Sequence, residues 1–234
     1  MSLKYLLLSI FILLTSDLSF AQVNAKTNQA TNQISGDVQL LSQYIERGLS
    51  MSDNNPAMNA SFLYNLGSQM RMGFWGSNIS NLSATDDNFW FKFLAQFDVL
   101  FGSNLNSHFY ISDDHFYKSN QRNGQRFGVN FEYYTYIFGF EWMSNFEGTH
   151  ANAEYINFGK YFYHGGTKMR YGGIAGYTLN TVRGVNSYFD LKAVGQYLLN
   201  TTTTFEVGIT LNLNNTYFGK RGDPELYAGV KLAY

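Results

Sequence analysis

The sequence predicts an all-β protein, a transmembrane antiparallel up-and-down β-barrel of about 12 strands. Three observations support this. Apolar and polar residues alternate along most of the chain after residue 35, aromatic residues make up 18% and charged residues only 14% of the chain, and short turns alternate with longer polar loops. Alternation indicates strands with two different faces, and aromatic side chains favour strands. No window after residue 35 has the spacing of an amphipathic helix.

Residues 1–21 are predicted to be a secretory signal peptide. Lys4 supplies its positive charge, residues 5–14 form its apolar run, and small residues precede the cleavage point after Ala21. The run is too short for the roughly 20 residues of a spanning helix, although a retained anchor is the alternative. Residues 22–35 are polar and without periodicity, so we expect a flexible periplasmic segment before a barrel at 36–234.

In the first half of the barrel, most expected strands alternate clearly. They cover 37–47, 57–66, 69–78, 88–100, 105–113 and 125–133. In the fourth, Phe91 and Phe93 flank Lys92, so aromatic rings and charge lie on opposite faces. The segment 105–113 is the weak one, because only Phe109 and Ile111 mark its apolar face.

The second half continues the same rhythm. Its expected strands cover 135–144, 152–163, 167–178, 187–199, 202–213 and 226–234. The segment 152–163 is ambiguous, because Glu154 and Lys160 share a face with Ile156 and Phe158. The two weak segments leave 10 or 14 strands as alternatives.

The last segment, Leu226–Tyr234, alternates fully and ends on an aromatic residue. This ending is typical of the closing strand of a bacterial outer-membrane barrel, which pairs with the first strand so that no edge faces lipid. We therefore expect Leu226–Tyr234 to engage the outer-membrane assembly machinery. The half-buried last strand of a soluble sheet is the alternative for this stretch alone.

The pattern of charges predicts which face points outward. In nearly every expected strand the charged residues lie opposite the aromatic ones. A barrel of about 12 strands is wider than one that side chains can fill, so an aromatic interior would leave voids. We therefore expect aromatic side chains to face lipid and charged ones to face an aqueous lumen. A soluble sandwich or ligand-binding barrel would have the opposite orientation.

This orientation assigns 14 charged residues to the lumen. They are Arg47, Arg71, Lys92, Arg126, Lys160, Arg170, Lys192, Lys231, Asp98, Glu132, Glu141, Glu154, Asp190 and Glu206. The pore-lining candidates among them are Arg47, Arg71, Lys92, Glu132, Glu141, Arg170, Asp190, Lys192, Glu206 and Lys231. Nearly balanced charges either orient polar solutes in a transverse field or pair across strands, and pairing is the expectation for any single residue. Arg47-Gly48 is expected at the barrel rim, packed with Tyr44.

The first three segments also carry a recognisable pattern. Ser42-Gln43-Tyr44-Ile45-Glu46-Arg47-Gly48-Leu49-Ser50, Pro56-Ala57 and Gly73-Phe74-Trp75-Gly76-Ser77-Asn78 resemble the TorF-type porin family of gram-negative bacteria. The motif-bearing match covers roughly residues 37–80, with Tyr44, Arg47, Gly48, Trp75, Ser77 and Asn78 as its marked positions. The resemblance implies an outer-membrane location and a porin role but no particular solute. Gln43 replaces a usual Asp and Lys92 stands where the family tends to be acidic, so solute selectivity is not carried over.

Signatures of catalysis and of metal binding are missing. The chain has no cysteine, and His108, His115, His150 and His164 are dispersed without a metal-binding spacing. We therefore expect no catalytic residue, metal or cofactor, and the net charge of −1 favours no nucleic-acid partner. A lipid hydrolase at the rim, using His115 or His150, remains an alternative.

Together these features predict an outer-membrane channel for the passive diffusion of small hydrophilic solutes. A structural or adhesive barrel that does not conduct is the second hypothesis.

Overall fold

The computed structural model describes residues 34–80, 87–118, 120–164, 167–180 and 187–234. The expected signal peptide and most of the expected 22–35 segment lie outside these residues. Ile34 and Ser35 belong to the first strand, where they pair with Tyr64 and Leu63, so the barrel begins two residues earlier than predicted.

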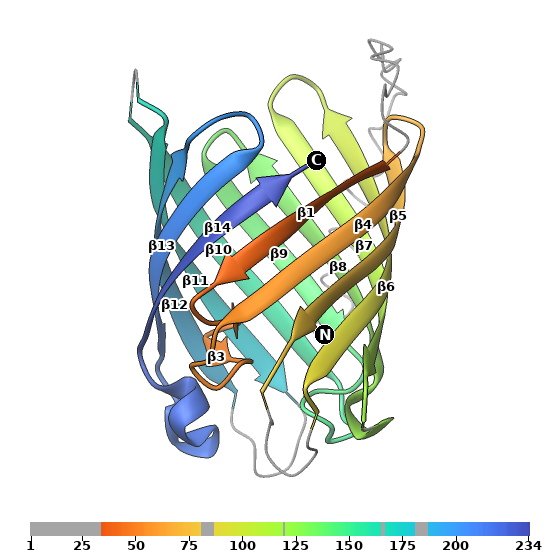
Figure 1. Cartoon of the computed structure of the whole chain (residues 1–234), viewed down its shortest axis with the longest axis vertical. Coiled ribbons are helices and arrows are strands. Elements are labelled where there is room, and N and C mark those ends of the chain that lie inside the picture. Colours follow the sequence, from red (N-terminus) through yellow and green to blue (C-terminus); the bar gives the residue numbers. More distant parts are fainter. Residues whose placement is uncertain (1–33, 81–86, 119, 165–166, 181–186) are drawn as a thin grey trace, which may run out of the picture.

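The described residues form a closed barrel of 12 antiparallel strands, which confirms the predicted fold class (Figure 1). The strands are β1 (Ile34–Leu41), β4 (Ala57–Leu66), β5 (Met70–Asn78), β6 (Phe89–Phe101), β7 (Leu105–Phe116), β8 (Gly124–Tyr133), β9 (Tyr136–Met143), β10 (Ala153–Tyr163), β11 (Met169–Asn180), β12 (Tyr188–Leu198), β13 (Thr203–Asn212) and β14 (Glu225–Ala233). Each pairs with its neighbours along the chain. The two weak segments are the full strands β7 and β10, so the alternatives of 10 and 14 strands are wrong.

The last strand closes the barrel on the first one, as the Leu226–Tyr234 pattern predicts. β14 pairs with β1 in the register Asp37↔Ala233 to Leu41↔Gly229. Beyond this ladder, Gly36 and Tyr234 exchange backbone hydrogen bonds of 3.2 and 3.0 Å. The sheet therefore leaves no edge unpaired among its described strands.

Connections alternate in length around the barrel. Short turns at 67–69, 102–104, 134–135 and 199–202 gather at one end, and longer segments at 42–56, 117–123, 144–152 and 213–224 gather at the other (Figure 1). The longer segments include the 3₁₀ turns η1 (Asn120–Arg122), η2 (Asn215–Tyr217) and η3 (Gly219–Gly222). We call these the turn end and the loop end.

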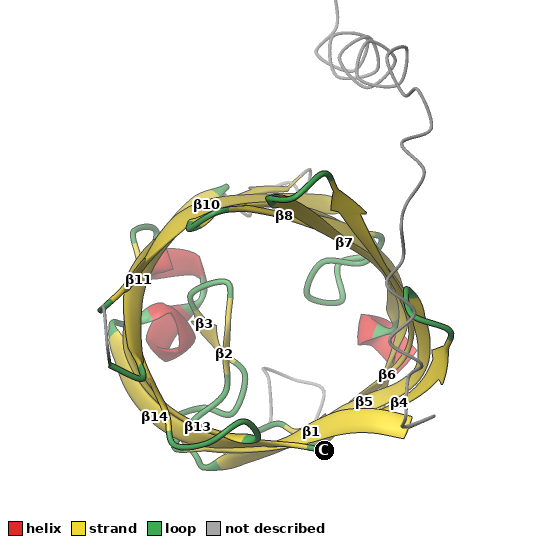
Figure 2. Ribbon diagram, turned by 90° about the horizontal axis from the view of Figure 1, so that it is seen from above, coloured by secondary structure: helices red, strands yellow, loops and turns green. Residues whose placement is uncertain are grey.

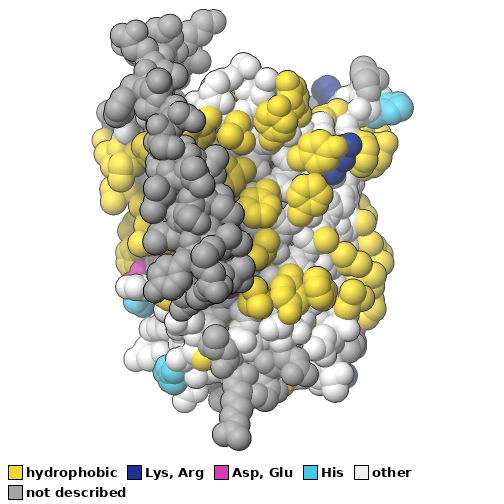
Figure 3. Space-filling model, turned by 180° about the vertical axis from the view of Figure 1, so that it is seen from behind, with side chains coloured by type: hydrophobic (Ala, Val, Ile, Leu, Met, Phe, Trp, Pro, Cys, Tyr) yellow, Lys and Arg dark blue, Asp and Glu magenta, His cyan; other side chains and the backbone are white. Residues whose placement is uncertain are grey.

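The outer face of the barrel is apolar. Figure 3 shows hydrophobic side chains spread over it, and Phe62, Phe158 and Val207 are 47%, 55% and 55% exposed. Their strand neighbours Ser61, Asn157 and Glu206 lie on the opposite face. This is the orientation that the sequence predicts, with apolar rows outside and polar rows inside. Among the described residues, no helix is long and apolar enough to span a membrane.

The first strand is shorter than the predicted 37–47. β1 ends at Leu41, and the chain then turns into the barrel as a hairpin of β2 (Ile45–Glu46) and β3 (Leu49–Ser50), visible inside the ring of strands in Figure 2. Its two turn residues, Arg47 and Gly48, have φ angles of 49° and 70°. Positive φ at both positions matches the twist of a tight hairpin, and glycine adopts it without strain. We call residues 42–56 the inner loop.

The buried apolar core surrounds this inner loop at the loop end. One cluster packs Leu49 against Met143, Phe146, Ala153, Tyr188 and Phe218. A second packs Met51 against Ile79, Trp90 and Phe116, with Tyr44 and Trp75 beside it. The core therefore fastens the inner loop to the wall.

Candidate functional site

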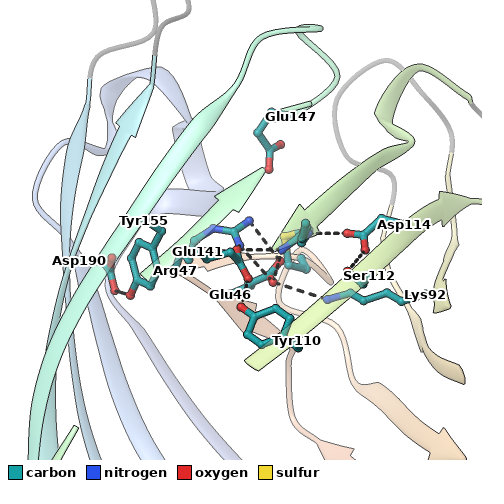
Figure 4. Close-up of polar contacts among 12 residues, drawn as sticks. Glu46, Arg47, Lys92, Tyr110, Ser112, Asp114, Glu141, Glu147, Tyr155 and Asp190 are labelled. Carbon is teal, nitrogen blue, oxygen red and sulfur yellow. Dashed lines mark hydrogen bonds and ion pairs between the residues drawn. The ribbon is translucent and has the colours of Figure 1, made fainter. Parts of the chain in front are cut away.

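Charged side chains of the inner loop pair with charged side chains of the wall. Arg47 Nη1 lies 2.6 Å from Glu141 Oε1 on β9, and Arg126 Nη1 on β8 lies 2.8 Å from Glu46 Oε1 (Figure 4). Arg126 Nε also lies 2.5 Å from Asp114 Oδ2 on β7. These pairs tie the tip of the hairpin across the lumen to the wall formed by β7–β9.

Strand register explains why these wall residues meet. Gly128 on β8 lies opposite Glu141 on β9 and Tyr110 on β7. A Cβ at Gly128 would lie 2.2 Å from Tyr110 Cζ, so only glycine lets this ring lie flat against β8. The Tyr110 hydroxyl then donates a hydrogen bond to Glu141 Oε2 and fixes the carboxylate that receives Arg47.

A third cation joins the network over aromatic rings. Lys92 Nζ on β6 lies 4.6 and 4.1 Å from the ring centroids of Trp75 and Trp90, and 4.0 Å from Glu46 Oε1. The guanidinium of Arg126 lies 4.8 Å from the Trp90 ring. Ring faces attract cations in this range, so the rings hold the cations in place beside the carboxylates.

The resulting constriction network is electrically balanced. It contains three carboxylates and three cations, Glu46, Asp114, Glu141, Arg47, Lys92 and Arg126. Burial raises the pKa of Glu46, which lies in the hairpin outside the spanning strands, but Arg126, Arg47 and Lys92 outweigh it and lower that pKa to about 2. Glu46 is therefore ionised at neutral pH and keeps its partners.

A second ion-pair cluster holds the inner loop from the loop end. Glu147, between β9 and β10, lies 2.7 Å from Arg122 and 2.9 Å from Arg221 through its Oε2 atom. Arg221 Nε also donates to the Ser50 carbonyl at 3.1 Å. The loop segments thus clamp the hairpin on the side away from the turn end.

On the turn side of the hairpin, the lumen opens into a cavity of about 410 Å³. Its lining combines polar side chains with apolar ones such as Ile137 and Ile174. The amides, tyrosines and charged side chains among the lining residues include Asn59, Asn130, Asn157, Tyr155, Tyr227, Asp190, Lys192 and Glu206. Lys192 Nζ lies 3.4 Å from Glu206 Oε1, and Tyr227 donates to the same oxygen at 2.6 Å. This volume and lining are typical of a site for a small polar molecule.

The pore-lining candidates fall into three groups. Arg47, Lys92 and Glu141 meet in the constriction network, and Asp190, Lys192 and Glu206 line the cavity. The remaining four candidates lie outside both groups. Arg71 forms an ion pair with Asp98 at 2.7 Å, and Lys231 forms one with Asp37 at 2.6 Å. Arg170 donates a hydrogen bond to Gln196, and Glu132 is exposed near the turn between β8 and β9. Most of the charges therefore pair across strands, as expected for single residues.

Two lumen assignments are wrong. Glu154 and Lys160 point outward with Ile156 and Phe158, and Lys160 Nζ donates to the Tyr136 hydroxyl at 3.0 Å on the outer face. Lysine reaches a polar boundary along its own apolar stem, so a position near a strand end tolerates it on the apolar face.

Several motif residues turn out to support the inner loop. The Tyr44 ring lies 5.7 Å from the Trp75 ring, and Asn78 bonds the Pro56 carbonyl and the Met58 amide at 3.0 and 2.6 Å. Ser77 donates to Asn59 at 2.5 Å. The placement of Arg47-Gly48 at the rim is wrong, because the hairpin carries both residues into the lumen.

Sequence reasoning missed Glu46, Asp114 and Tyr110 as members of the network. Glu46 adjoins Arg47 in the motif, which is a usable signal, but Asp114 lies just beyond the expected strand 105–113, where alternation assigns no face. Its inward position follows only from the extension of β7 to Phe116, three residues beyond the predicted end.

Two histidines pair with aspartates on opposite faces of β7 and the neighbouring strand. His115 lies 2.8 Å from Asp113 on the outer side of β7, and His108 lies 2.5 Å from Asp98 in the lumen. The hydrogen-bond partner of the His115 ring is the Asp113 carboxylate, and within the described ranges no group of three or more metal-binding side chains occurs.

Solved outer-membrane proteins, two of them porins, share this architecture. A KdgM porin superposes with a TM-score of 0.56 at 9% identity, over 86% of this chain and 99% of that chain. A NanC porin gives 0.56 at 8% identity over 85% and 98%, and the outer membrane protein Omp33 of Acinetobacter baumannii gives 0.51 at 8% over 86% and 98%. At these identities the likeness shows the fold alone.

Sequence comparison identifies the family. No curated protein matches the chain. A family model described as "Bacterial protein of unknown function (Gcw_chp)" matches residues 25–233. The narrower resemblance to TorF-type porins stays a prediction. Because the match spans almost the whole barrel, the chain belongs to the Gcw_chp family.

Proposed function

We propose that this protein is an outer-membrane channel through which small hydrophilic solutes diffuse down their gradients. The observation that carries the proposal is the separation of the two faces: the outside of the barrel is apolar, and the inside holds a cavity into which charged, amide and tyrosine side chains project. A barrel whose only task is to sit in lipid needs no such lumen.

The balanced constriction network supports a preference for neutral or zwitterionic solutes. Three cations and three carboxylates leave no net field to concentrate an ion of one sign. One solved structure similar in fold is titled as the KdgM porin in complex with disordered oligogalacturonate, a polyanion. We do not expect the present barrel to favour such a ligand, because its network offers no excess of positive charge.

The same proposal includes location and assembly. Cleavage of residues 1–21 would export the chain, the turn end and both ends of the barrel chain would face the periplasm, and Leu226–Tyr234 would contact the assembly machinery. Determining the N-terminal residue of protein purified from the outer-membrane fraction tests the export step. A mature chain beginning at Gln22 supports it, and an intact Met1 contradicts it.

Planar bilayers test conduction directly. The full barrel, refolded and added to a bilayer in KCl solution, is expected to give small, reproducible current steps with a weak ion preference. Absence of steps from protein that migrates as a folded barrel would remove the channel proposal.

One observation favours a second candidate function, a structural barrel that does not conduct. The inner loop is fastened to the wall by two apolar clusters and by two sets of ion pairs. If the wild-type barrel is silent and a variant with a shortened inner loop conducts, the inner loop is a plug. That result would favour the structural role.

A further inference from the structure

The lumen contains a buried carboxylate without a cation. Asp190 on β12 is 4% exposed, and its Oδ1 accepts a hydrogen bond of 3.2 Å from the Tyr155 hydroxyl. Its Oδ2 has no partner among the described residues, and no described cation forms an ion pair with it. The nearby cations are already committed, since Lys192 pairs with Glu206 and Arg47 with Glu141. A buried carboxylate that has one oxygen unbonded and makes no ion pair is unfavourable and calls for a partner.

The surroundings of Asp190 hold it in place. A Cβ at Gly48 would lie 2.6 Å from Asp190 Cβ, so the hairpin tip rests directly on this side chain. A Cβ at Gly176 would lie 2.5 Å from Asp190 Oδ2, so the carboxylate lies close over that glycine. Two glycines thus make room for one carboxylate between the inner loop and the wall.

A second unpartnered group lies near it. Thr210 on β13 is 3% exposed, and its Oγ1 has no hydrogen-bond partner among the described residues. Register places Thr210 opposite Lys192 and Asn212 opposite Asp190, so Thr210 and Asp190 point into the lumen from adjacent strands. Both line the cavity of about 410 Å³, together with Tyr155.

We propose that this cavity binds a small polar solute through a protonated primary amine at Asp190. An ammonium group supplies the positive charge and the hydrogen-bond donors that Asp190 Oδ2 and Thr210 Oγ1 lack. The amides and tyrosines around the cavity accept and donate to hydroxyl groups on the rest of the solute. The inference rests on the proposed function for the solute's route, but binding itself requires no conduction.

Calorimetry on the full barrel in detergent micelles tests the proposal, with glucosamine and glucose as probes of equal size. The wild-type barrel is expected to bind glucosamine roughly tenfold more tightly than glucose, the gain of one charge-assisted hydrogen bond. Asp190→Asn should abolish the preference. Asp98→Asn, which alters a carboxylate outside the cavity, should keep it. Equal binding of the two sugars, or an unchanged preference in Asp190→Asn, overturns the proposal.

A second variant and a salt titration complete the test. Thr210→Val keeps the shape of the side chain and removes its hydroxyl, so a several-fold weaker binding of glucosamine is expected even if Asp190→Asn does not fold. A free inorganic cation could supply the same charge. Titration with KCl distinguishes it: potassium binding that is lost in Asp190→Asn, without glucosamine binding, overturns the assignment to an amine. Failure of conduction in bilayers would leave these binding results unaffected.

Discussion

At the scale of single residues, Arg126 is the centre of the constriction network. It contacts Glu46, Asp114 and Glu141, and its guanidinium lies over Trp90. We expect Arg126→Met to cost about 3–5 kcal/mol, because removing one member of a buried network leaves the others uncompensated. The network would also change from balance to a net negative charge. Denaturant unfolding in lipid vesicles measures the first effect, and a reversal potential shifted toward cations measures the second.

Arg71→Met is the matched control. Arg71 makes a single ion pair with Asp98, and about a third of each side chain is exposed. Exposed ion pairs contribute roughly 0–1 kcal/mol to stability, so we expect Arg71→Met to cause a small loss of unfolding free energy and a small shift of the reversal potential. Equal losses in the two variants would contradict the central role of Arg126.

The lowered pKa of Glu147 predicts how the stability of the loop end responds to acid. Burial raises its pKa, but Arg221 and Arg122 outweigh burial and lower the pKa from 4.5 to about 2. Because its pKa is lowered, ionised Glu147 contributes at most about 3 kcal/mol to the free energy of unfolding. This contribution is complete above pH 4.5 and is lost as the pH falls toward 2. Thermal melting between pH 7 and pH 3 should show Glu147→Gln less stable at pH 7 and less sensitive to acid. Glu154→Gln, an exposed position on the outer face, should melt like the wild type throughout.

At the scale of elements, the sequence predicts the strands of the barrel wall but not the inner loop. Alternation placed all 12 spanning strands, because the period of 2 depends only on neighbouring residues and on the two environments of the wall. The same alternation runs past Leu41 to Arg47, so it could not show that the chain leaves the wall there. A turn of Arg-Gly also lacks the Asn-Gly or Asp-Gly signature of tight hairpins.

Membership of the candidate site was harder to predict for the same reason. Whether a residue has an odd or an even position along a strand decides which face of the barrel wall it lies on. This rule puts Lys92, Glu141 and Asp190 on the inner face, where the structure has them. The alternation does not show how far along the barrel axis a side chain lies, or which side chain faces it across the lumen. Both depend on the stagger in register between neighbouring strands. The rule that charge marks the inner face fails for Glu154 and Lys160, whose position along β10 puts them on the outer face with Ile156 and Phe158.

Replacing residues 43–55 by a short Gly-Ser linker tests the role of the inner loop. The barrel wall keeps its ladders, since β1 ends at Leu41 and β4 begins at Ala57. We expect a folded barrel with a several-fold larger single-channel conductance, because the hairpin and its network no longer narrow the lumen. Replacing the turn 102–104 between β6 and β7 by Gly-Ser-Gly alters the turn end, away from the inner loop and its ion pairs, and should change conductance little. Unchanged conductance after removal of 43–55 would show that the path is limited elsewhere.

At the scale of the whole molecule, a channel requires that the aromatic face of the barrel meets lipid and the polar face meets water. Phe158 and Asn157 are neighbours in the middle of β10, and they point in opposite directions, with Phe158 outside and Asn157 lining the cavity. A charged residue on the lipid face near the midplane costs about 2–4 kcal/mol, whereas a charge in an aqueous lumen costs little. Phe158→Arg should therefore lower the unfolding free energy in lipid vesicles by that amount. Asn157→Arg should fold with a smaller loss and change the ion preference instead. The reverse ranking would mean that the aromatic face is not the lipid face, because no aqueous lumen would then accept the arginine at position 157.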